Sequence, residues 1–295
     1  MNSKFYEKSF FSSGKKLAYA CCFISFPAFV SSCNIINPAE PVPAYLHVDS
    51  FSVKTDPLTQ GSSSHRIVDA WVFVDGNIVG AFEMPVNVPV LSAGMHKVTV
   101  RPGILVNGIA ATRSIYPFYS GYDTVMNLES AKINTAMTAT FYNASAKFKI
   151  EDFEQTGSIF KKVPGSDTDF VIVHNVQTFE GNAGAVYLDN THGFFESAWK
   201  DSIPLPFSGP AFVELNYQSD NPFTVGLISY VNNSYYTDDI VSFKASSSWK
   251  KEYVSLGSLI SNYVGARGFK IYIKATKNAG QSSALLYFDN IKVVY

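Results

Sequence analysis

Residues 68–76 read VDAWVFVDG, and this stretch predicts a β-strand that ends in a tight turn. Side chains alternate along a strand between its two faces. One face of the stretch carries aliphatic side chains, Val68, Ala70, Val72 and Val74. The opposite face carries Asp69, Trp71, Phe73 and Asp75. Asp75-Gly76 then supplies residue types that adopt positive φ in a two-residue hairpin, so the pattern favours an antiparallel sheet.

The same signals recur through residues 45–142. MHKVTVR, at positions 95–101, alternates in the same way, and Asn107-Gly108 supplies a second turn in which both residues tolerate positive φ. Turn-forming residues return about every ten positions, and no helical period persists. Residues 44–143 are therefore predicted to form an immunoglobulin-like (Ig-like) sandwich of about seven or eight short strands.

Residues 148–295 keep the composition of strands but change their pattern. The segments with strand character include KFKIEDFE, AFVELNYQ, GFKIYIKAT and LLYFDNIKVV. The stretch NASAK, residues 143–147, breaks the alternation and marks the boundary. The sequence therefore predicts an all-β protein with two β-sandwich domains in series.

Composition narrows the function classes. Charged residues make up 16% of the chain, aromatic residues make up 15%, and the formal net charge is −1. Binding to nucleic acid needs a basic stripe that neutralises phosphates, and the sequence has no such stripe. We therefore expect no nucleic-acid partner, and the large share of aromatic residues suits an exported β-protein.

A positively charged segment and an apolar run open the chain. Four lysines precede the run, which extends from Leu17 to Val30. A helix of this length reaches roughly 21 Å, short of the roughly 30 Å hydrocarbon core of a bilayer. The pattern predicts a secretory signal and not a membrane-spanning helix.

Val30-Ser31-Ser32-Cys33 closes this segment with an aliphatic residue, two small residues and a cysteine. The segment resembles the signal peptide and lipobox of Gram-negative lipoproteins. The resemblance implies a signal peptide over residues 1–32, acylation of Cys33 with palmitate-type chains, and a proline-rich, lipid-anchored spacer over residues 33–43. The alternative is a plain secretory signal that leaves Cys33 as a free thiol. No Asp follows Cys33 directly, which favours the outer membrane and leaves its leaflet, periplasmic or cell-surface, undetermined.

Residues 74–104 resemble carboxypeptidase-regulatory-like and PEGA-type β-sandwich modules. The resemblance is carried by a VDG hairpin, Val74-Asp75-Gly76, ahead of a strand of the form G-x-H-x-V-x-V, which runs here from Gly94 to Val100. It implies an Ig-like domain without an active site, of a kind that acts as a spacer or an adhesive module.

The closing strand carries a second resemblance, to the jelly-roll sandwiches of carbohydrate-binding modules and galactose-binding-like domains. Their last strand commonly has the form Y-x-D-N-I/V-x-V, and the matching residues are Tyr287, Asp289, Asn290, Ile291 and Val293. The resemblance implies a jelly-roll over residues 148–295 and a structural Ca²⁺ bound near the first and last strands. The candidate ligands are Glu151, Glu154 and Asp289. Asp289 can equally cap a turn by accepting hydrogen bonds from backbone N–H groups.

Enzyme motifs are missing from the sequence. There is no Gly-x-Ser-x-Gly elbow, no His-Glu-x-x-His pair and no phosphate-binding glycine loop, and the five histidines are scattered. Acids at 151–154 and 238–239 could form a carboxylate pair for glycoside cleavage, but adjacent acids in turns are more often solvated or capping groups. We therefore expect a non-catalytic protein.

Alternation also predicts which side chains the second domain presents to solvent. In GFKIYIKAT the outward set is Lys270, Tyr272 and Lys274, and in AFVELNYQ it is Glu214, Asn216 and Gln218. A pyranose offers C–H faces to aromatic rings and hydroxyls to amides, so Tyr272, Asn216 and Gln218 form the candidate sugar site. The adjacent Tyr235 and Tyr236, in a predicted polar loop, are candidates for a recognition tip. Trp249 is expected to pack in the core.

These patterns together predict a membrane-anchored, non-catalytic lipoprotein that binds glycan or another surface polymer through its second domain. The alternative is a structural or adhesion component of a cell-envelope assembly, with an envelope protein as its partner, aromatic residues in its cores and no sugar site.

Overall fold

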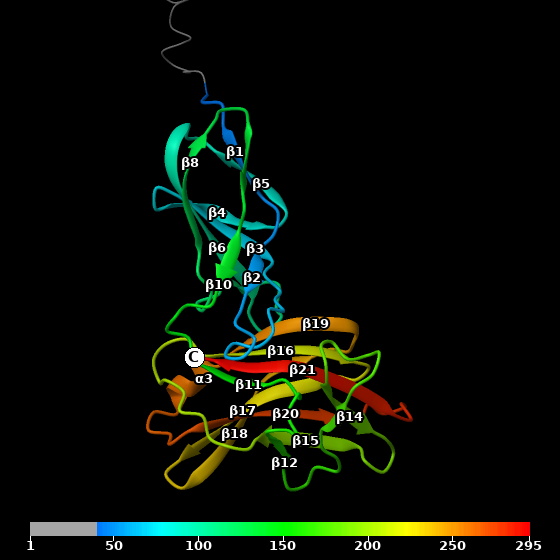
Figure 1. Cartoon of the computed structure of the whole chain (residues 1–295). Helices are drawn as coiled ribbons and strands as arrows, with labels where there is room; N and C mark the ends of the chain where they lie inside the picture. The colour runs from blue at the N-terminus through cyan, green and yellow to red at the C-terminus, as the bar shows by residue number, and fades with distance from the viewer. Residues whose placement is uncertain (1–39) are drawn as a thin grey trace, which may run out of the picture. The chain divides into compact units, whose positions relative to one another are not determined.

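The computed structural model describes residues 40–295, which are almost entirely β-structure (Figure 1). Among these residues one helix occurs, α3 (Gly257–Asn262). The all-β prediction is therefore confirmed. The predicted signal peptide (1–32), the lipidation residue Cys33 and most of the predicted spacer (33–43) lie outside the described residues. Between residues 40 and 295 no helix is long and apolar enough to cross a bilayer.

The first sandwich has more strands than the predicted number of about seven or eight, because several of its strands are very short. They are β1 (Ala44–Val48), β2 (Ser52–Lys54), β3 (Asp69–Val74), β4 (Asn77–Glu83), β5 (Val86–Val90), β6 (Gly94–Leu105), β7 (Arg113–Ile115), β8 (Tyr122–Leu128), β9 (Ile133–Ala136) and β10 (Ala139–Phe141). One sheet has the order β4-β3-β6-β7, with β8 also paired to β6. It packs against the sheet β5-β1-β9, and β2 and β10 form a separate parallel pair.

The core of the first sandwich lies between these two sheets. Ala70, Val72 and Val74 of β3 are buried there against β1 and β5, as the alternation of residues 68–76 predicts. The hairpin between β3 and β4 turns at Asp75 and Gly76, whose φ angles are 49° and 81°. The predicted two-residue turn is therefore confirmed.

The second sandwich consists of two packed antiparallel sheets. Its strands are β11 (Phe148–Glu151), β12 (Phe160–Lys162), β13 (Val171–Val173), β14 (Ala183–Leu188), β15 (Phe194–Trp199), β16 (Phe212–Ser219), β17 (Phe223–Val231), β18 (Ser234–Phe243), β19 (Ser246–Ser255), β20 (Phe269–Thr276) and β21 (Ala284–Val294). The six-stranded sheet has the order β13-β14-β21-β16-β19, with β11 paired to β21. The five-stranded sheet has the order β12-β15-β20-β17-β18. The first and last strands pair, with Phe148 opposite Val294, as in a jelly-roll.

Both sheets of the second sandwich contribute to one apolar core. Ile271 and Ile273 of β20 and Val213 and Leu215 of β16 are buried in it, as their alternation predicts. The connection between β10 and β11 contains residues 143–147, where the sequence loses its strand pattern.

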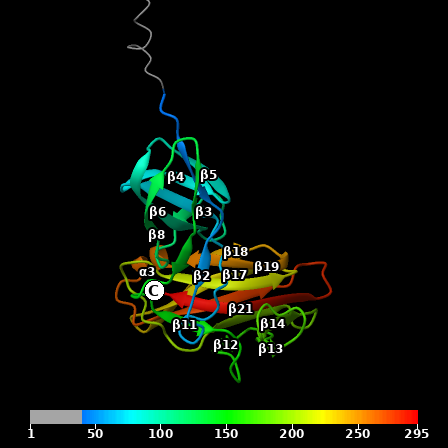
Figure 2. The same ribbon diagram turned by 45° about the horizontal axis from the view of Figure 1, so that its top comes forward.

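Both sandwiches belong to one compact unit, residues 44–295. A cluster of buried aromatic and aliphatic side chains joins them, and in this cluster the Tyr116 ring lies 5.2 Å from Phe212 and 5.0 Å from Tyr253. The backbone N–H of Asn107 donates to the Tyr253 carbonyl at 2.8 Å. Figures 1 and 2 both show the segment that follows β2 lying against β21. The first sandwich therefore covers one end of the outer face of the six-stranded sheet.

Candidate functional site

A buried carboxylate lies where the two sandwiches meet. Glu214, on the outer face of β16, is fully buried. The Tyr116 hydroxyl donates to its Oε1 at 2.7 Å, and the Tyr142 hydroxyl donates to the same oxygen at 2.8 Å. Lys251 of β19 places its Nζ 3.1 Å from the other oxygen, Oε2. Two tyrosines of the first sandwich and a lysine of the second therefore surround this carboxylate.

The charges of this cluster depend on one another. Burial alone would raise the pKa of Glu214, but the Lys251 and Lys292 cations and the two tyrosine hydroxyls hold it below its usual value. Lys292 of β21 has its pKa lowered to about 7 by burial and by the charge of Lys251. Its Nζ donates to the Ser62 carbonyl at 2.5 Å. The joint between the sandwiches is thus a polar network enclosed by aromatic rings.

Asn216 lies on the same face of β16 as Glu214, and it is buried too. Its Nδ2 donates to Oγ of Ser64 in the first sandwich at 2.8 Å. The prediction that Glu214 and Asn216 are exposed is therefore wrong, although both point away from the core of the second sandwich. Alternation predicts which face of β16 a side chain lies on. It does not predict that residues 61–66, which are distant in the sequence, cover this part of the outer face.

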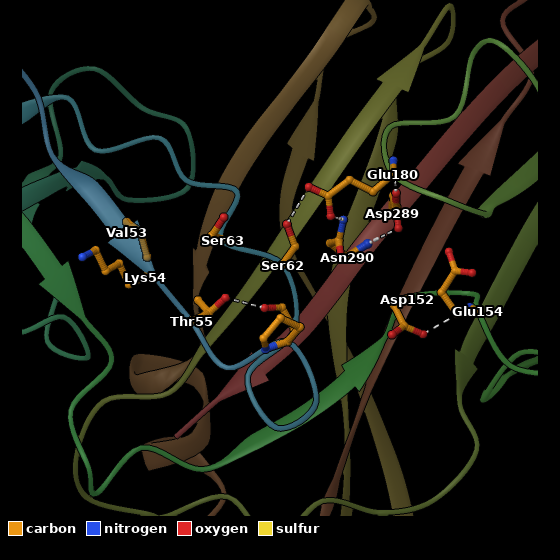
Figure 3. A pocket seen from close by; sticks show the side chains of 12 residues that line it. Val53, Lys54, Thr55, Ser62, Ser63, Asp152, Glu154, Glu180, Asp289 and Asn290 are labelled. Atoms are coloured by element: carbon orange, nitrogen blue, oxygen red, sulfur yellow. Dashed lines mark hydrogen bonds between the residues drawn. The ribbon is translucent and has the colours of Figure 1, made fainter.

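The segment after β2 and the six-stranded sheet border a cavity of about 680 Å³ (Figure 3). Four acidic residues of the second sandwich line it, Asp152, Glu154, Glu180 and Asp289. Figure 3 shows Glu180 between Ser62 and Asn290: the Ser62 hydroxyl donates to its Oε1 at 3.0 Å, and Asn290 Nδ2 donates to its Oε2 at 3.2 Å. The cavity is acidic, and both sandwiches contribute to its wall.

Asp289 is held by the backbone around it. Its carboxylate accepts hydrogen bonds from the N–H groups of Asn290 at 2.7 Å and Glu180 at 3.1 Å. Asn290 itself has a φ of 49° and lies inside β21, where the pairing with β16 shifts register, so the Asp289 carboxylate holds the backbone at a β-bulge. Burial, together with the nearby charges of Glu180 and Glu154, raises the pKa of Asp289 to about 7. Asp289 therefore accepts hydrogen bonds from backbone N–H groups, as one of its two alternatives expects, but it does so within a strand and not in a turn.

The structure does not bring the three predicted calcium ligands together. Glu154 and Asp289 line the same cavity, but Glu151 does not. The Glu151 carboxylate accepts hydrogen bonds from the N–H groups of Phe153 at 2.9 Å and Ile159 at 2.6 Å. Between residues 40 and 295 no group of three or more acidic, histidine or cysteine side chains is arranged to bind a metal ion. The Ca²⁺ site stays a prediction.

Replacing Asp289 with Asn should change how stability depends on pH. A carboxyl whose pKa is about 7 in the folded protein binds its proton more tightly there than in the unfolded chain, where it titrates near 4. The stability that it contributes is present below about pH 4 and is lost as the pH rises towards 7. The free energy of unfolding of Asp289→Asn minus that of wild type should therefore increase by about 1–3 kcal/mol from pH 5 to pH 8. Urea unfolding at the two pH values measures this change. An equal difference at both pH values contradicts this.

Beyond the covered part, the same sheet face borders a second cavity of about 580 Å³. Gln218 of β16 and Tyr287 of β21 line it, and Gln218 Nε2 donates to the Ser247 carbonyl at 2.7 Å. The ring of Trp249 lies 6.4 Å from that of Tyr287 and 5.5 Å from that of Phe179. An amide and one aromatic ring, that of Tyr287, therefore line this cavity, and the rings of Trp249 and Phe179 lie next to it.

Trp249 is a residue that sequence reasoning placed wrongly. It is partly exposed instead of packed in the core, and its Nε1 donates to the Gln177 carbonyl at 2.8 Å. Trp249 shares the outward face of β19 with Lys251 and Tyr253, since the three alternate along the strand. This alternation is the sequence signal that predicts an outward position for Trp249.

Tyr272 does not join Asn216 and Gln218, because β20 belongs to the five-stranded sheet and β16 to the six-stranded one. The predicted three-residue sugar site is therefore wrong. Tyr272 is also fully buried: a side chain at Gly226 would collide with its ring, and its hydroxyl donates to Asp239.

Tyr235 and Tyr236 are exposed, as predicted, but they are the second and third residues of strand β18 and do not lie in a loop. The turn before them is shorter than predicted, with Asn232 and Asn233 at positive φ. Neighbouring residues of a strand point to opposite faces, so the two rings do not form one tip. The Tyr235 ring instead packs 4.8 Å from Tyr230 on the next strand.

Comparisons with known proteins identify no family. No family model matches the chain, and no curated protein matches it. Among solved structures, the family 11 carbohydrate-binding module from Clostridium thermocellum in complex with a β-1,3-1,4-mixed-linked tetrasaccharide is 17% identical, over 51% of this chain and 96% of that chain, with a TM-score of 0.37. The CBM22-2 xylan-binding domain from Paenibacillus barcinonensis is 10% identical, over 49% of this chain and 97% of that chain, with a TM-score of 0.38.

A third solved structure holds the CBM22-1 and GH10 modules of an endo-1,4-β-D-xylanase from Clostridium thermocellum complexed with xylohexaose. It is 10% identical over 49% of this chain, with a TM-score of 0.38. The chain covers only 28% of that longer protein.

Proposed function

We propose that this protein binds a glycan, without cleaving it, in the cavity lined by Gln218 and Tyr287, next to the ring of Trp249. The observation that carries the proposal is the meeting of an amide and aromatic rings at the part of the six-stranded sheet that the first sandwich leaves uncovered. The cavity volume, about 580 Å³, lies within the range of roughly 300–1,000 Å³ of small-ligand pockets.

The chemistry of a sugar suits this opening. The apolar C–H face of a pyranose packs on an aromatic ring, and the partly exposed Trp249 lies beside Tyr287 of this cavity. The sugar hydroxyls need donors and acceptors, which the Gln218 amide and the serine-rich start of β19 supply. The described residues that contact this cavity include one carboxylate, Asp220, whose Oδ1 accepts a hydrogen bond from the Leu285 N–H at 2.8 Å. Glycoside cleavage usually needs two carboxyl groups, so a cavity with one carboxylate fits binding without cleavage.

Trp249→Ala and Gln218→Ala should each weaken binding. Losing a stacked ring or a hydrogen bond costs about 1–2 kcal/mol, so we expect the dissociation constant to rise about fivefold to thirtyfold. The measurement is affinity electrophoresis of the whole mature protein in gels that contain neutral or acidic polysaccharides. Tyr235→Ala, which removes an exposed ring from the other sheet, is the matched control and should bind like wild type.

Two outcomes contradict this proposal. Weaker binding by Tyr235→Ala together with unchanged binding by Trp249→Ala would move the site to the five-stranded sheet. Folded wild-type protein that no polymer retains would favour the alternative, a structural or adhesion component that binds an envelope protein. Release of reducing sugar during these experiments would contradict the non-catalytic part of the proposal.

We further propose that a lipid on Cys33 holds the protein at the outer membrane. The lysine-rich start, the apolar run and the Val30–Cys33 motif support this. Cells that express Cys33→Ala should incorporate no labelled palmitate into the protein, whereas wild type incorporates it. Equal labelling of the two proteins, or wild type that is released into the medium, would show that the anchor is absent.

A further inference from the structure

One end of the first sandwich exposes large apolar side chains. Leu91 is 70% exposed, Met95 67%, Ile133 62% and Ile78 59%. We call these four residues the apical patch. Scattered apolar side chains are ordinary on a protein surface, but a group at one end of a domain indicates an interaction site.

The strand pairing places the apical patch at a single end. Leu91 follows Val90, which pairs with Ala44 at the start of β1, and Ile133 pairs with the next residue, Tyr45. Ile78 lies in a cavity of about 330 Å³ that Leu91 also lines. Met95 is the second residue of β6, directly after the turn that contains Leu91.

The opposite end of the same strands already has a partner. β6 begins at the apical end, where Met95 lies, and Asn107 follows its other end. The Asn107 side chain accepts a hydrogen bond from the Ser255 N–H at 2.9 Å. The second sandwich therefore covers that end, and the apical patch lies at the end away from it.

Two acids near the apical patch have side-chain partners. The Asp75 carboxylate lies 2.6 Å from the His96 ring, and the Glu129 carboxylate lies 2.5 Å from Lys132 Nζ. Paired carboxylates repel an anionic surface less than free ones. The end of the sandwich thus combines exposed apolar side chains with one acid paired to a lysine and one hydrogen-bonded to a histidine ring.

The covalent chain limits how far this end lies from the predicted anchor. Ten residues, 34–43, lie between Cys33 and Ala44, and the eleven steps from one to the other span at most about 40 Å at about 3.6 Å each. We propose that the apical patch contacts the bilayer surface to which Cys33 is anchored, with Leu91 and Met95 entering the boundary between headgroups and acyl chains. This inference rests on the lipid anchor proposed above.

A fluorescent label tests the contact. The mature chain has no cysteine other than Cys33, whose sulfur is blocked in the lipidated protein, so a new cysteine can be labelled selectively. Leu91→Cys and Met137→Cys are each labelled with an environment-sensitive nitrobenzoxadiazole dye and reconstituted in vesicles of phosphatidylethanolamine and phosphatidylglycerol. Met137 is 83% exposed and follows the end of β9 away from the apical patch, so it is the matched control.

We expect the label at position 91 to shift its emission to the blue and to be quenched about twofold or more by spin-labelled lipids, and the label at position 137 to do neither. Equal responses at the two positions would overturn the proposal. A blue shift at position 91 that grows with protein concentration in the absence of vesicles would indicate a second copy of the chain and would also overturn it.

Vesicle flotation separates this proposal from that of the anchor. Protein that does not float contradicts the anchor alone. In that case the same two labelled variants, carrying Cys33→Ser and an N-terminal histidine tag, are tethered to vesicles that contain nickel-chelating lipid. A blue shift and quenching at position 91 but not at position 137 then support contact of the apical patch with the bilayer, and equal responses overturn it.

Discussion

Residues 144–295 expressed alone should be less stable than the same residues in the whole chain by about 5–9 kcal/mol. Three side chains that the first sandwich buries, Phe212, Tyr253 and Val294, become exposed in such a fragment. Burial of one side chain of this size contributes about 1.5–3 kcal/mol, which gives this total for the three. Guanidinium unfolding followed by tryptophan fluorescence measures the difference, because Trp199 and Trp249 both lie in the fragment.

The matched control for this experiment is the whole chain cut once between residues 143 and 147. Cutting removes the covalent link but keeps both surfaces together, so we expect the two pieces to co-elute and to keep most of the stability of the intact chain. A fragment that equals the whole chain to within about 1 kcal/mol would mean that the second sandwich folds independently of the first.

Glu214→Leu should destabilise the whole protein by about 3–5 kcal/mol. The substitution leaves Lys251 buried without its partner and leaves the Tyr116 and Tyr142 hydroxyls without their acceptor. Removing one member of a buried ion pair typically has a cost of this size, whereas replacing both members with apolar residues often has little. Glu214→Leu combined with Lys251→Met should therefore recover part of the loss. Thermal and urea unfolding of the two variants measure this, and a single variant within about 1 kcal/mol of wild type would contradict it.

Glu214→Gln adds a pH test of the same site. Because the folded protein lowers the pKa of Glu214, the ionised form contributes stability above the pKa of the unfolded chain, and this stability is lost as the pH falls through the folded pKa. The gap in stability between wild type and Glu214→Gln should therefore be widest near neutral pH and close in acid. A gap that stays constant would show that the charge of Glu214 has no part in the joint.

Local sequence pattern predicts which side chains face the core. Val72 of β3 and Ile271 of β20 are buried because the alternation of apolar residues on a strand follows from backbone geometry alone. The Asp75-Gly76 turn was predictable for the same reason, since the residue types that tolerate positive φ are few. These features need no knowledge of distant contacts.

The site depends on contacts that the pattern does not contain. Asn216 is buried because Ser64, in the other sandwich, lies over it, and no local property of β16 indicates that neighbour. Alternation groups Tyr272 with Asn216 and Gln218, but strands of a jelly-roll cross between two sheets, so the outward faces of β16 and β20 lie on opposite sides of the sandwich. Predicting the site therefore required the sheet order and the position of the first sandwich.

The pairing of β1 bears on mechanical strength. The chain enters the first sandwich at Ala44, and β1 is hydrogen-bonded to antiparallel β5 on one side and to parallel β9 on the other. Traction applied at Ala44 acts along the axis of β1, across the direction of these bonds, so the bonds on both flanks share the load and must rupture together. A protein tethered at this terminus while it grips a polymer in flow would hold until a threshold force and then yield abruptly.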